Sequence, residues 1–205
     1  KGIKLGASYK SPQSFGNFDF ENTYLDGSKA PKVKFKMNYP AIISLGIGYS
    51  KNKIDVALDY RFVNYKNTAG FKDKGWTNTA SVAGFGWKNI SIVSAGIQYK
   101  GINKFPLRVG YTYSSNPISS ELAFFSTPAT AVIKNAFQFG FGYEFNSRFN
   151  LNAVYHHGSS SGKTSGPLLS PMLKSAANPY GTVPGSNVSY KMTTDMVMFG
   201  FNYSF

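Results

Sequence analysis

Apolar residues alternate strictly with small or polar residues along most of the chain. Between residues 136 and 145 the odd positions read Phe, Phe, Phe, Tyr and Phe, whereas the even positions read Ala, Gln, Gly, Gly and Glu. A period of two residues predicts a β-strand with one apolar face and one small or polar face, not a helix. The same pattern predicts seven further strands, at residues 3–10, 43–49, 54–62, 93–100, 107–114, 150–156 and 197–205.

The segments between the predicted strands alternate in length. Short turns are expected at residues 50–53, 101–105 and 146–149, and long loops at 11–34, 66–85, 115–134 and 158–189. In an up-and-down meander all short turns then fall at one end and all long loops at the other, as in bacterial outer-membrane barrels. We therefore predict an all-β, antiparallel, up-and-down transmembrane β-barrel segment of eight strands that forms a single domain over residues 1–205.

The two faces of the predicted strands indicate which surroundings each face meets. One face carries mostly Gly, Ser, Asn, Thr and Gln, which suits a wet or ligand-holding lumen. The apolar face ends in Tyr or Phe, as the aromatic girdles of membrane barrels require. A soluble sandwich or a lipocalin-like binder also alternates, but its apolar face points into a core. The last residue, Phe205, closes an alternating run in the manner of an outer-membrane assembly signal.

Composition excludes several kinds of chemistry. The chain has no Cys, which excludes a disulfide framework, a cysteine metal site and a thiol nucleophile. No apolar run reaches the length of a transmembrane helix. The two histidines, His156 and His157, are adjacent, so in a strand they point to opposite faces and cannot chelate one metal ion together. Because no serine is singled out as a partner for His156, the sequence predicts neither an enzyme nor a bound cofactor.

Lysines in or beside the long loops, such as Lys29, Lys32, Lys72 and Lys163, contribute to a formal net charge of +13. No nucleic-acid motif accompanies them, so nucleic acid is not the predicted partner. The loops are predicted to face outward, where the phosphates of lipopolysaccharide are the more natural anions. Outer-membrane lipids around the barrel are the other expected partners. The alternative is that these lysines are simply solvated.

Six short segments, in this order, resemble the C-terminal half of FadL-type outer-membrane transporters, which carry long-chain fatty acids or aromatic hydrocarbons. They are GASYKSP at 6–12, YPAIISLG at 39–46, ALDYRFVNY at 57–65, GWKN at 86–89, LRVGY at 107–111 with NPI at 116–118, and FGFNYSF at 199–205. The resemblance implies a 14-stranded barrel whose first six strands and lumen-plugging hatch precede residue 1. The rest of the barrel would then be a missing partner of this chain. The alternative is a complete eight-stranded barrel, which also fits 205 residues.

Charged residues on the polar face are candidates for a head-group clamp. Arg61 and Arg108 are favoured, since a guanidinium binds a carboxylate in a bidentate manner. Asp59 lies two residues from Arg61 on the same face and could pair with it. Ser114 stands after Tyr113, where the family often carries an acid. Fatty-acid members of the family can carry a basic residue before the GWKN segment, but residues 81–85 here read SVAGF. A desolvated carboxylate needs a cation or several donors, so this loss of charge favours an uncharged cargo over a fatty acid. The alternative is a hydrogen-bonded network that only satisfies a polar lumen.

Apolar residues in the long loops are candidates for capturing cargo. Phe124 and Phe125 lie in one loop, and Leu168, Leu169 and Met172 lie in another, where we expect them to be exposed. Flexible loops that carry Met and Leu can form an adaptable apolar groove. The alternative is that the loops pack on one another over the mouth of the barrel.

These observations predict an outer-membrane channel for passive uptake of hydrophobic molecules, either long-chain fatty acids or hydrocarbons. The loops would capture the cargo and the lumen would conduct it. The competing hypothesis is a structural or adhesive eight-stranded barrel whose loops bind lipopolysaccharide or another partner.

Overall fold

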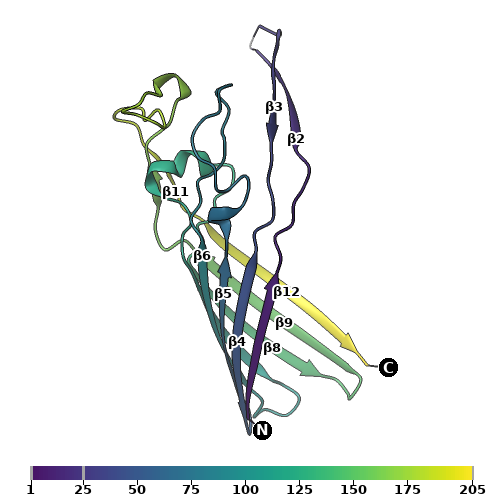
Figure 1. Ribbon diagram of the computed structural model, residues 1–205. Coiled ribbons are helices and arrows are strands. Elements are labelled where there is room, and N and C mark those ends of the chain that lie inside the picture. Colours follow the sequence, from purple (N-terminus) through teal and green to yellow (C-terminus); the bar gives the residue numbers. More distant parts are fainter. Residues whose placement is uncertain (1, 25, 205) are drawn as a thin grey trace.

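The computed structural model describes residues 2–24 and 26–204, so Phe205 and its predicted role lie outside the described residues. Eight antiparallel strands form one sheet in the order β1-β4-β5-β6-β7-β8-β9-β12 (Figure 1). Their bounds are β1 (Gly2–Lys10), β4 (Ile42–Lys51), β5 (Ile54–Val63), β6 (Ile90–Tyr99), β7 (Leu107–Ser114), β8 (Asn135–Glu144), β9 (Phe149–Ser159) and β12 (Thr193–Tyr203). All eight strands that the alternation predicts are therefore confirmed.

The eight-stranded sheet is open. Strands β1 and β12 are its two edges, and the described residues of these two strands do not pair with each other. The alternative of a closed eight-stranded barrel is therefore wrong for this chain. An open edge carries N–H and C=O groups without ladder partners, which hydrocarbon does not tolerate.

The connections fall at the two ends of the sheet as predicted. Short turns join β4 to β5, β6 to β7 and β8 to β9, and they lie with both chain ends at one end of the sheet (Figure 1). The long loops lie together at the opposite end. This arrangement has the asymmetry of outer-membrane barrels, in which the long loops are extracellular.

The apolar face of the sheet is exposed along its whole width. Register pairing keeps the apolar residues in line across all eight strands, for example Leu5, Ile47 and Leu58, or Val109, Phe139 and Tyr155. Tyrosines mark both ends of this face, with Tyr49, Tyr99, Tyr143 and Tyr203 toward the turns and Tyr9, Tyr60, Tyr113 and Tyr155 toward the loops. An exposed apolar face bounded by two aromatic girdles is a lipid-facing face, not the inward face of a soluble sandwich.

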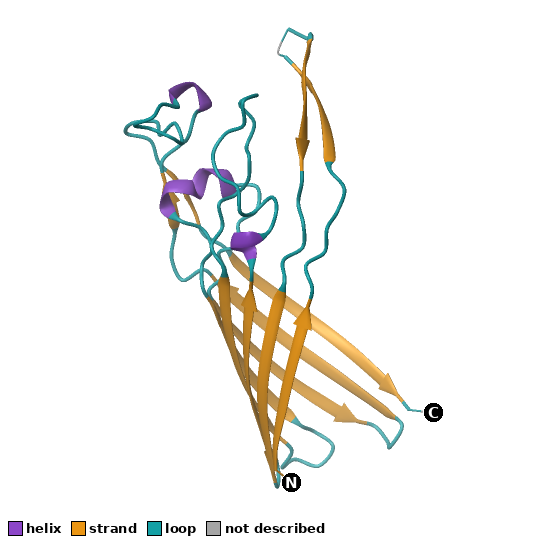
Figure 2. Cartoon of the chain, in the orientation of Figure 1, coloured by secondary structure: helices purple, strands orange, loops and turns teal. Residues whose placement is uncertain are grey.

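The long loops contain regular structure that the alternation did not predict. Two hairpins occur, β2 (Phe18–Thr23) with β3 (Lys29–Phe35) and β10 (Thr164–Gly166) with β11 (Val188–Tyr190). Short 3₁₀ helices span η1 (Tyr65–Asn67), η2 (Ser120–Ser126) and η3 (Pro171–Leu173) (Figure 2). The 3₁₀ helices and strands β10 and β11 have too few residues for a period to show in the sequence. Among the described helices, none is long and apolar enough to cross a membrane.

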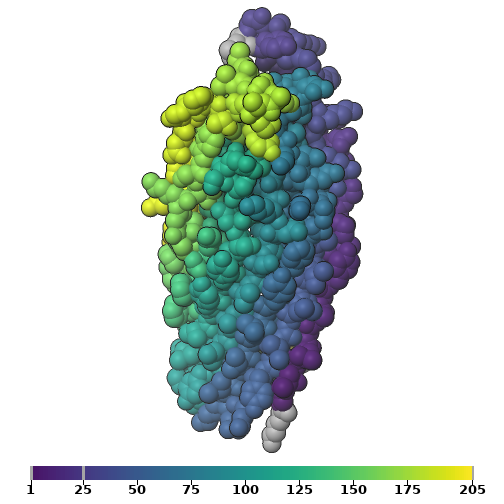
Figure 3. Space-filling view, turned by 60° about the vertical axis from the view of Figure 1, so that its left-hand side comes forward, coloured from purple at the N-terminus to yellow at the C-terminus, as the bar shows by residue number. Residues whose placement is uncertain are grey.

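The buried core of the chain lies in the loops and not between sheets. One cluster contains Phe71, Phe85, Trp87, Ile118, Ala123 and Val132. A second cluster contains Leu122, Phe125 and Leu169, with Trp76 and Phe124 packed against it. We call the loop region built on these two clusters the cap. It covers the loop end of the sheet, where segments distant in sequence pack together (Figure 3).

Replacing Leu122 by Ala tests whether the cap has its own stability. Leu122 is 2% exposed, so Leu122→Ala should cost about 2–5 kcal/mol of cap stability. Both tryptophans lie in the cap, so tryptophan fluorescence reports on the cap while circular dichroism reports on the strands. We expect the fluorescence transition in denaturant to move to lower concentration and the strand transition to stay. The matched control is Met172→Ala, because Met172 is 92% exposed. Equal shifts in both signals would contradict an independent cap.

Candidate functional site

At the middle of four neighbouring strands, the lumen face of the sheet carries only very small side chains, and we call this row of residues smooth. Gly48, Ala57, Gly96 and Gly110 stand in one row across four neighbouring strands. No side chain in this row is larger than a methyl group, so the wall leaves space inside the barrel. Such a face can line a passage, whereas most of the large apolar residues of the sheet project from the outer face.

A chain of polar contacts crosses the lumen face near the turn end. Lys100 pairs with Asp55 at 2.9 Å, and the Gln98 amide donates to the same carboxylate at 3.3 Å. Arg108 donates through Nε to Gln98 Oε1 at 2.6 Å and through a terminal nitrogen to Asn152 Oδ1 at 2.7 Å. This second bond passes over strand β8, where Gly140 faces Arg108 and offers no side chain to block it.

The two predicted arginines do not come together. Arg61 and Ser114 share one row, because both pair with Ile92, whereas Arg108 pairs with Gln98. Six positions of β6 separate these rows, which is about 20 Å along a strand. Arg61 forms no hydrogen bond or ion pair with the described residues, so the expected Asp59–Arg61 pair is absent from this part of the chain. The Asp59 carboxylate instead lies over Gly46.

The apolar loop residues divide into buried and exposed groups. Phe125 is 2% and Leu169 is 4% exposed, so the expectation that these two are exposed is wrong. They pack with Leu122 because a loop core lowers the apolar area that water would contact. Phe124 is half-buried against the same cluster, whereas Leu168 and Met172 remain exposed. The loops therefore pack on one another at this point, and whether the exposed pair binds cargo stays a prediction.

An apolar pocket opens at the base of the β2–β3 hairpin. Its volume is about 600 Å³. Its walls come from the segments that connect this hairpin to β1 and β4, and from the loop that follows β5. The lining residues are Phe15, Gly16, Asn17, Phe18, Met37, Asn38, Tyr39, Pro40, Tyr65 and Phe71. We call this cavity the entry pocket.

Backbone hydrogen bonds hold the entry pocket in shape. Gln13 and Tyr39 exchange two backbone hydrogen bonds, of 3.2 and 2.9 Å. These bonds join the two segments that connect the β2–β3 hairpin to the sheet. The Asn38 carboxamide oxygen accepts from the Phe15 N–H at 3.1 Å, and the Asn38 N–H donates to the carbonyl of Ala69. Asn38 therefore ties the hairpin base to the loop that carries Phe71.

The electrostatic character of the entry pocket is neutral. None of its lining residues is ionised at neutral pH. Burial raises the pKa of the Tyr65 phenol and keeps it uncharged. A cation contacts one lining residue from its side, because Lys10 Nζ lies 5.3 Å from the centre of the Tyr39 ring. A cation over a ring face is a favourable contact that engages this ammonium group.

The alternation pattern alone does not predict the entry pocket, because it leaves residues 11–34 as a long loop. The sequence did carry a signal: Phe18 and Phe20 alternate with Asp19 and Glu21, and Asp26-Gly27 is a common turn pair. The structure turns there, with Ser28 donating to the Asp26 carboxylate and Gly27 at a φ of 84°. Reading that turn would have placed Phe18 opposite Phe35.

The two histidines face opposite sides of the sheet, as predicted. His156 contacts Gln138 at 3.2 Å on the lumen face, and His157 contacts Asp195 at 2.8 Å on the outer face. Within the described residues, no group of three or more His, Cys, Asp or Glu side chains could hold a metal ion.

An antiparallel sheet with aromatic girdles outside, small residues inside and packed loops at one end defines part of an outer-membrane β-barrel. The sequence profile described as "Outer membrane protein transport protein (OMPP1/FadL/TodX)" matches residues 2–205. The chain therefore belongs to this FadL/TodX family, which is a family of the Gram-negative outer membrane. Among curated proteins, none matches the chain significantly.

Solved structures share the fold. A Pseudomonas aeruginosa FadL homologue superposes with a TM-score of 0.62 at 16% identity, over 98% of this chain and 48% of that chain. The Pseudomonas putida toluene transporter TodX gives 0.56 at 17% identity, over 100% of this chain and 46% of that chain. The Ralstonia pickettii toluene transporter TbuX gives 0.52 at 13% identity, over 98% and 44%. The chain thus spans about half the length of the structures it matches.

The pH dependence of the cap provides a test of its packing. The Tyr190 hydroxyl donates to the Ala123 carbonyl at 3.0 Å, and burial raises the pKa of Tyr190 to about 12. A raised pKa favours the neutral phenol in the folded cap. The stability that Tyr190 gives the folded cap is therefore complete below the unfolded pKa of about 10. This stability is lost as the pH rises toward about 12.

We expect tryptophan emission to shift to longer wavelength between about pH 10 and pH 12. Tyr190→Phe should show a smaller shift in this range, because it has no proton to lose there. Because the variant lacks the hydrogen bond to Ala123, the free energy of unfolding of its cap should also be about 1 kcal/mol lower at neutral pH. Identical titrations of the two proteins would contradict this role for Tyr190.

Proposed function

We propose that this chain forms part of a channel for the passive uptake of hydrophobic small molecules across the outer membrane. The observation that carries the proposal is the entry pocket, an open apolar cavity of about 600 Å³ at the loop end of a lipid-facing barrel wall. Apolar cavities of this size are typical of ligand-binding sites, and contiguous exposed apolar surface marks a place of interaction. No chemical step is needed, so the proposal includes neither a catalytic residue nor a cofactor.

The position of the pocket suggests the route. Tyr39 and Pro40 lie just before β4, and Phe15 and Gly16 follow β1, so the pocket stands above the β1 edge of the sheet. Cargo that leaves the pocket downward would meet the smooth row of Gly48 and Ala57 on the lumen face. The rest of the barrel would pair with the β1 and β12 edges and enclose this passage, since a spanning sheet must close.

The lining favours an uncharged, partly aromatic cargo. Five of the ten residues named for the entry pocket are Phe or Tyr, and the polar ones are neutral amides. A desolvated carboxylate would need a cation or several donors there. TodX and TbuX, two of the similar solved structures, are toluene transporters, which agrees with a small apolar cargo. Long-chain fatty acids remain the second candidate, with Arg61 as the group that could meet a carboxylate inside the lumen.

Lipopolysaccharide is a proposed partner of the loops on charge grounds alone. Part of the positive charge is already balanced on the β2–β3 hairpin, where Lys32 pairs with Glu21 and Lys34 pairs with Asp19. Such exposed pairs contribute little to stability. The structural or adhesive barrel is disfavoured as a complete molecule because the sheet is open.

Two neighbouring phenylalanines provide a matched test of the entry pocket. Phe18 and Phe20 lie on the same face of β2 and are 53% and 51% exposed, but only Phe18 lines the pocket. In full-length protein, Phe18→Ser should lower the uptake of dilute toluene about tenfold, from the loss of roughly 1.5 kcal/mol of apolar contact. Phe20→Ser should leave uptake near the wild-type rate. The measurement is accumulation of radiolabelled toluene in cells with equal surface expression. Equal effects of the two changes would contradict the pocket.

Removing the charge of Arg61 separates the two classes of cargo. Arg61→Gln should leave toluene uptake unchanged, because a neutral cargo does not need a guanidinium. If fatty acids are cargo, uptake of dilute oleate should fall by roughly tenfold or more, since a charged hydrogen bond contributes about 1.5–3 kcal/mol. Lys10→Gln is the control, because Lys10 is a cation engaged with Tyr39. A loss of toluene uptake in Arg61→Gln alone would contradict a neutral passage.

A further inference from the structure

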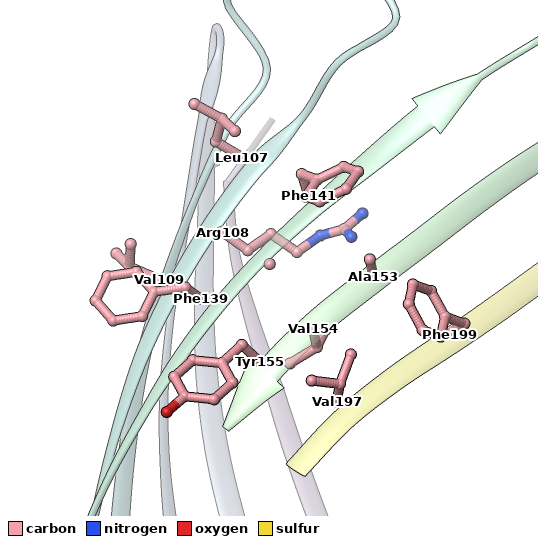
Figure 4. Close-up of a pocket in the computed structure, with 11 residues that line it drawn as sticks. Leu107, Arg108, Val109, Phe139, Phe141, Ala153, Val154, Tyr155, Val197 and Phe199 are labelled. Atoms are coloured by element: carbon pink, nitrogen blue, oxygen red, sulfur yellow. The ribbon is translucent and has the colours of Figure 1, made fainter. Parts of the chain in front are cut away.

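The outer face of the sheet has a hollow centred on Ala153. Its volume is about 530 Å³, and the residues that line it come from β7, β8, β9 and β12 (Figure 4). Ala153 is 6% exposed, although it belongs to the lipid-facing set. It lies between Phe141 of β8 and Phe199 of β12, and the next outward residue, Tyr155, lies between Phe139 and Val197. A methyl group among tall side chains thus produces a depression.

This hollow differs from other small positions on the same face. Ala95 also faces outward, in β6, between Leu58 and Tyr111. Its side chain is exposed, and it does not line the hollow around Ala153. The depression at Ala153 therefore arises from the walls of Phe and Tyr side chains around it and not from the small residue alone.

A polar cluster lies at the loop end of the hollow, still on the outer face. The Tyr155 hydroxyl donates to Asp195 Oδ1 at 2.6 Å, and His157 Nδ1 contacts the same oxygen at 2.8 Å. His157 and Asp195 are register partners, and they lie two residues closer to the loops than the pair of Tyr155 and Val197. Beside them, Asn135 bonds to the hydroxyls of Tyr111 and Ser161.

Part of this polar cluster is open to a ligand. The side chains of His157 and Asp195 are 42% and 56% exposed. Among the described residues, no partner uses His157 Nε2 or Asp195 Oδ2. The cluster therefore offers a carboxylate oxygen and an imidazole nitrogen next to an apolar hollow. Tyr155 belongs to both, since its ring lines the hollow and its hydroxyl joins the cluster.

We propose that the hollow and the cluster together bind an acylated sugar lipid of the outer leaflet. An acyl chain would fill the depression over Ala153. Hydroxyl or amide N–H groups of the sugar would donate to Asp195, and a sugar oxygen would lie against His157. The cluster lies at the extracellular end of the lipid-facing band, so that only the outer leaflet can present a head group there.

Charge distribution favours a sugar over a phosphate at the cluster itself. The Asp195 carboxylate repels a phosphate and accepts from a hydroxyl or an amide. Phosphates attached farther out on the sugar would meet cations, because Lys134, Lys163 and Lys191 lie in the loop segments next to β8, β9 and β12. A phospholipid places its phosphate directly above its acyl chains, which would bring the phosphate against the Asp195 carboxylate. It therefore fits the sequence of hollow, carboxylate and lysines less well.

Native mass spectrometry of the full-length protein in detergent tests the site with lipid A and phosphatidylethanolamine as probes. The wild-type protein should retain lipid A preferentially. Ala153→Phe fills the hollow and should lower lipid A retention about tenfold, equivalent to lost contact with roughly two methylene groups. Ala95→Phe is the matched control and should bind as the wild type does. If Ala153→Phe and Ala95→Phe bind lipid A alike, the site is refuted.

A second variant tests the head group and leaves the hollow intact. Asp195→Asn keeps the shape but replaces a charged acceptor, so the preference for lipid A over phosphatidylethanolamine should fall severalfold while retention of phosphatidylethanolamine stays unchanged. An unchanged preference would show an unspecific acyl crevice and overturn the proposal. Because Ala153 and Asp195 are remote from the entry pocket, toluene uptake by these variants is independent of this result.

Discussion

The whole structure depends on the need to pair every backbone N–H and C=O group within the hydrocarbon of the membrane. A strand cannot satisfy these groups by itself, so each of the eight strands must have a neighbour on both sides. Continuous antiparallel pairing meets this need from β4 to β9, with a register that is unbroken in every pair of the large sheet. At β1 and β12 the backbone is paired on one side only. Those two edges are the places where the remainder of a barrel would join.

Pairing of this kind inverts the usual distribution of apolar side chains. The sheet turns its large residues outward to lipid and keeps small or polar ones inside, so it has no core of its own. The buried apolar residues gather in the cap, where water surrounds the loops and the hydrophobic effect operates. Trp87 illustrates the difference, because it is buried in the cap and its indole N–H donates to the buried Ser126 hydroxyl at 2.9 Å. The cap in turn holds the loop that forms one wall of the entry pocket.

The polar groups of the two faces have different tasks. On the lumen face, Arg108 donates to Gln98 and Asn152 and so links β6, β7 and β9 near the turns. On the outer face, His157 and Asp195 mark the upper limit of the apolar band. The entry pocket carries no charge of its own. The proposed uncharged cargo agrees with a neutral pocket and a smooth lumen wall.

The sequence by itself determined the strands, their order, the two faces and the family, because alternation with a period of two is a local property that each strand carries in its own residues. It also placed His156 and His157 on opposite faces. Only the tertiary structure decided which loop residues are open. Phe125 and Leu169 became buried while Met172 stayed exposed, since burial depends on segments more than forty positions apart, such as the contact of Leu122 with Leu169. Likewise, Phe15 and Phe71 line one entry pocket, and residues from β7 to β12 line one hollow. No local sequence pattern encodes contacts between residues so far apart in the chain.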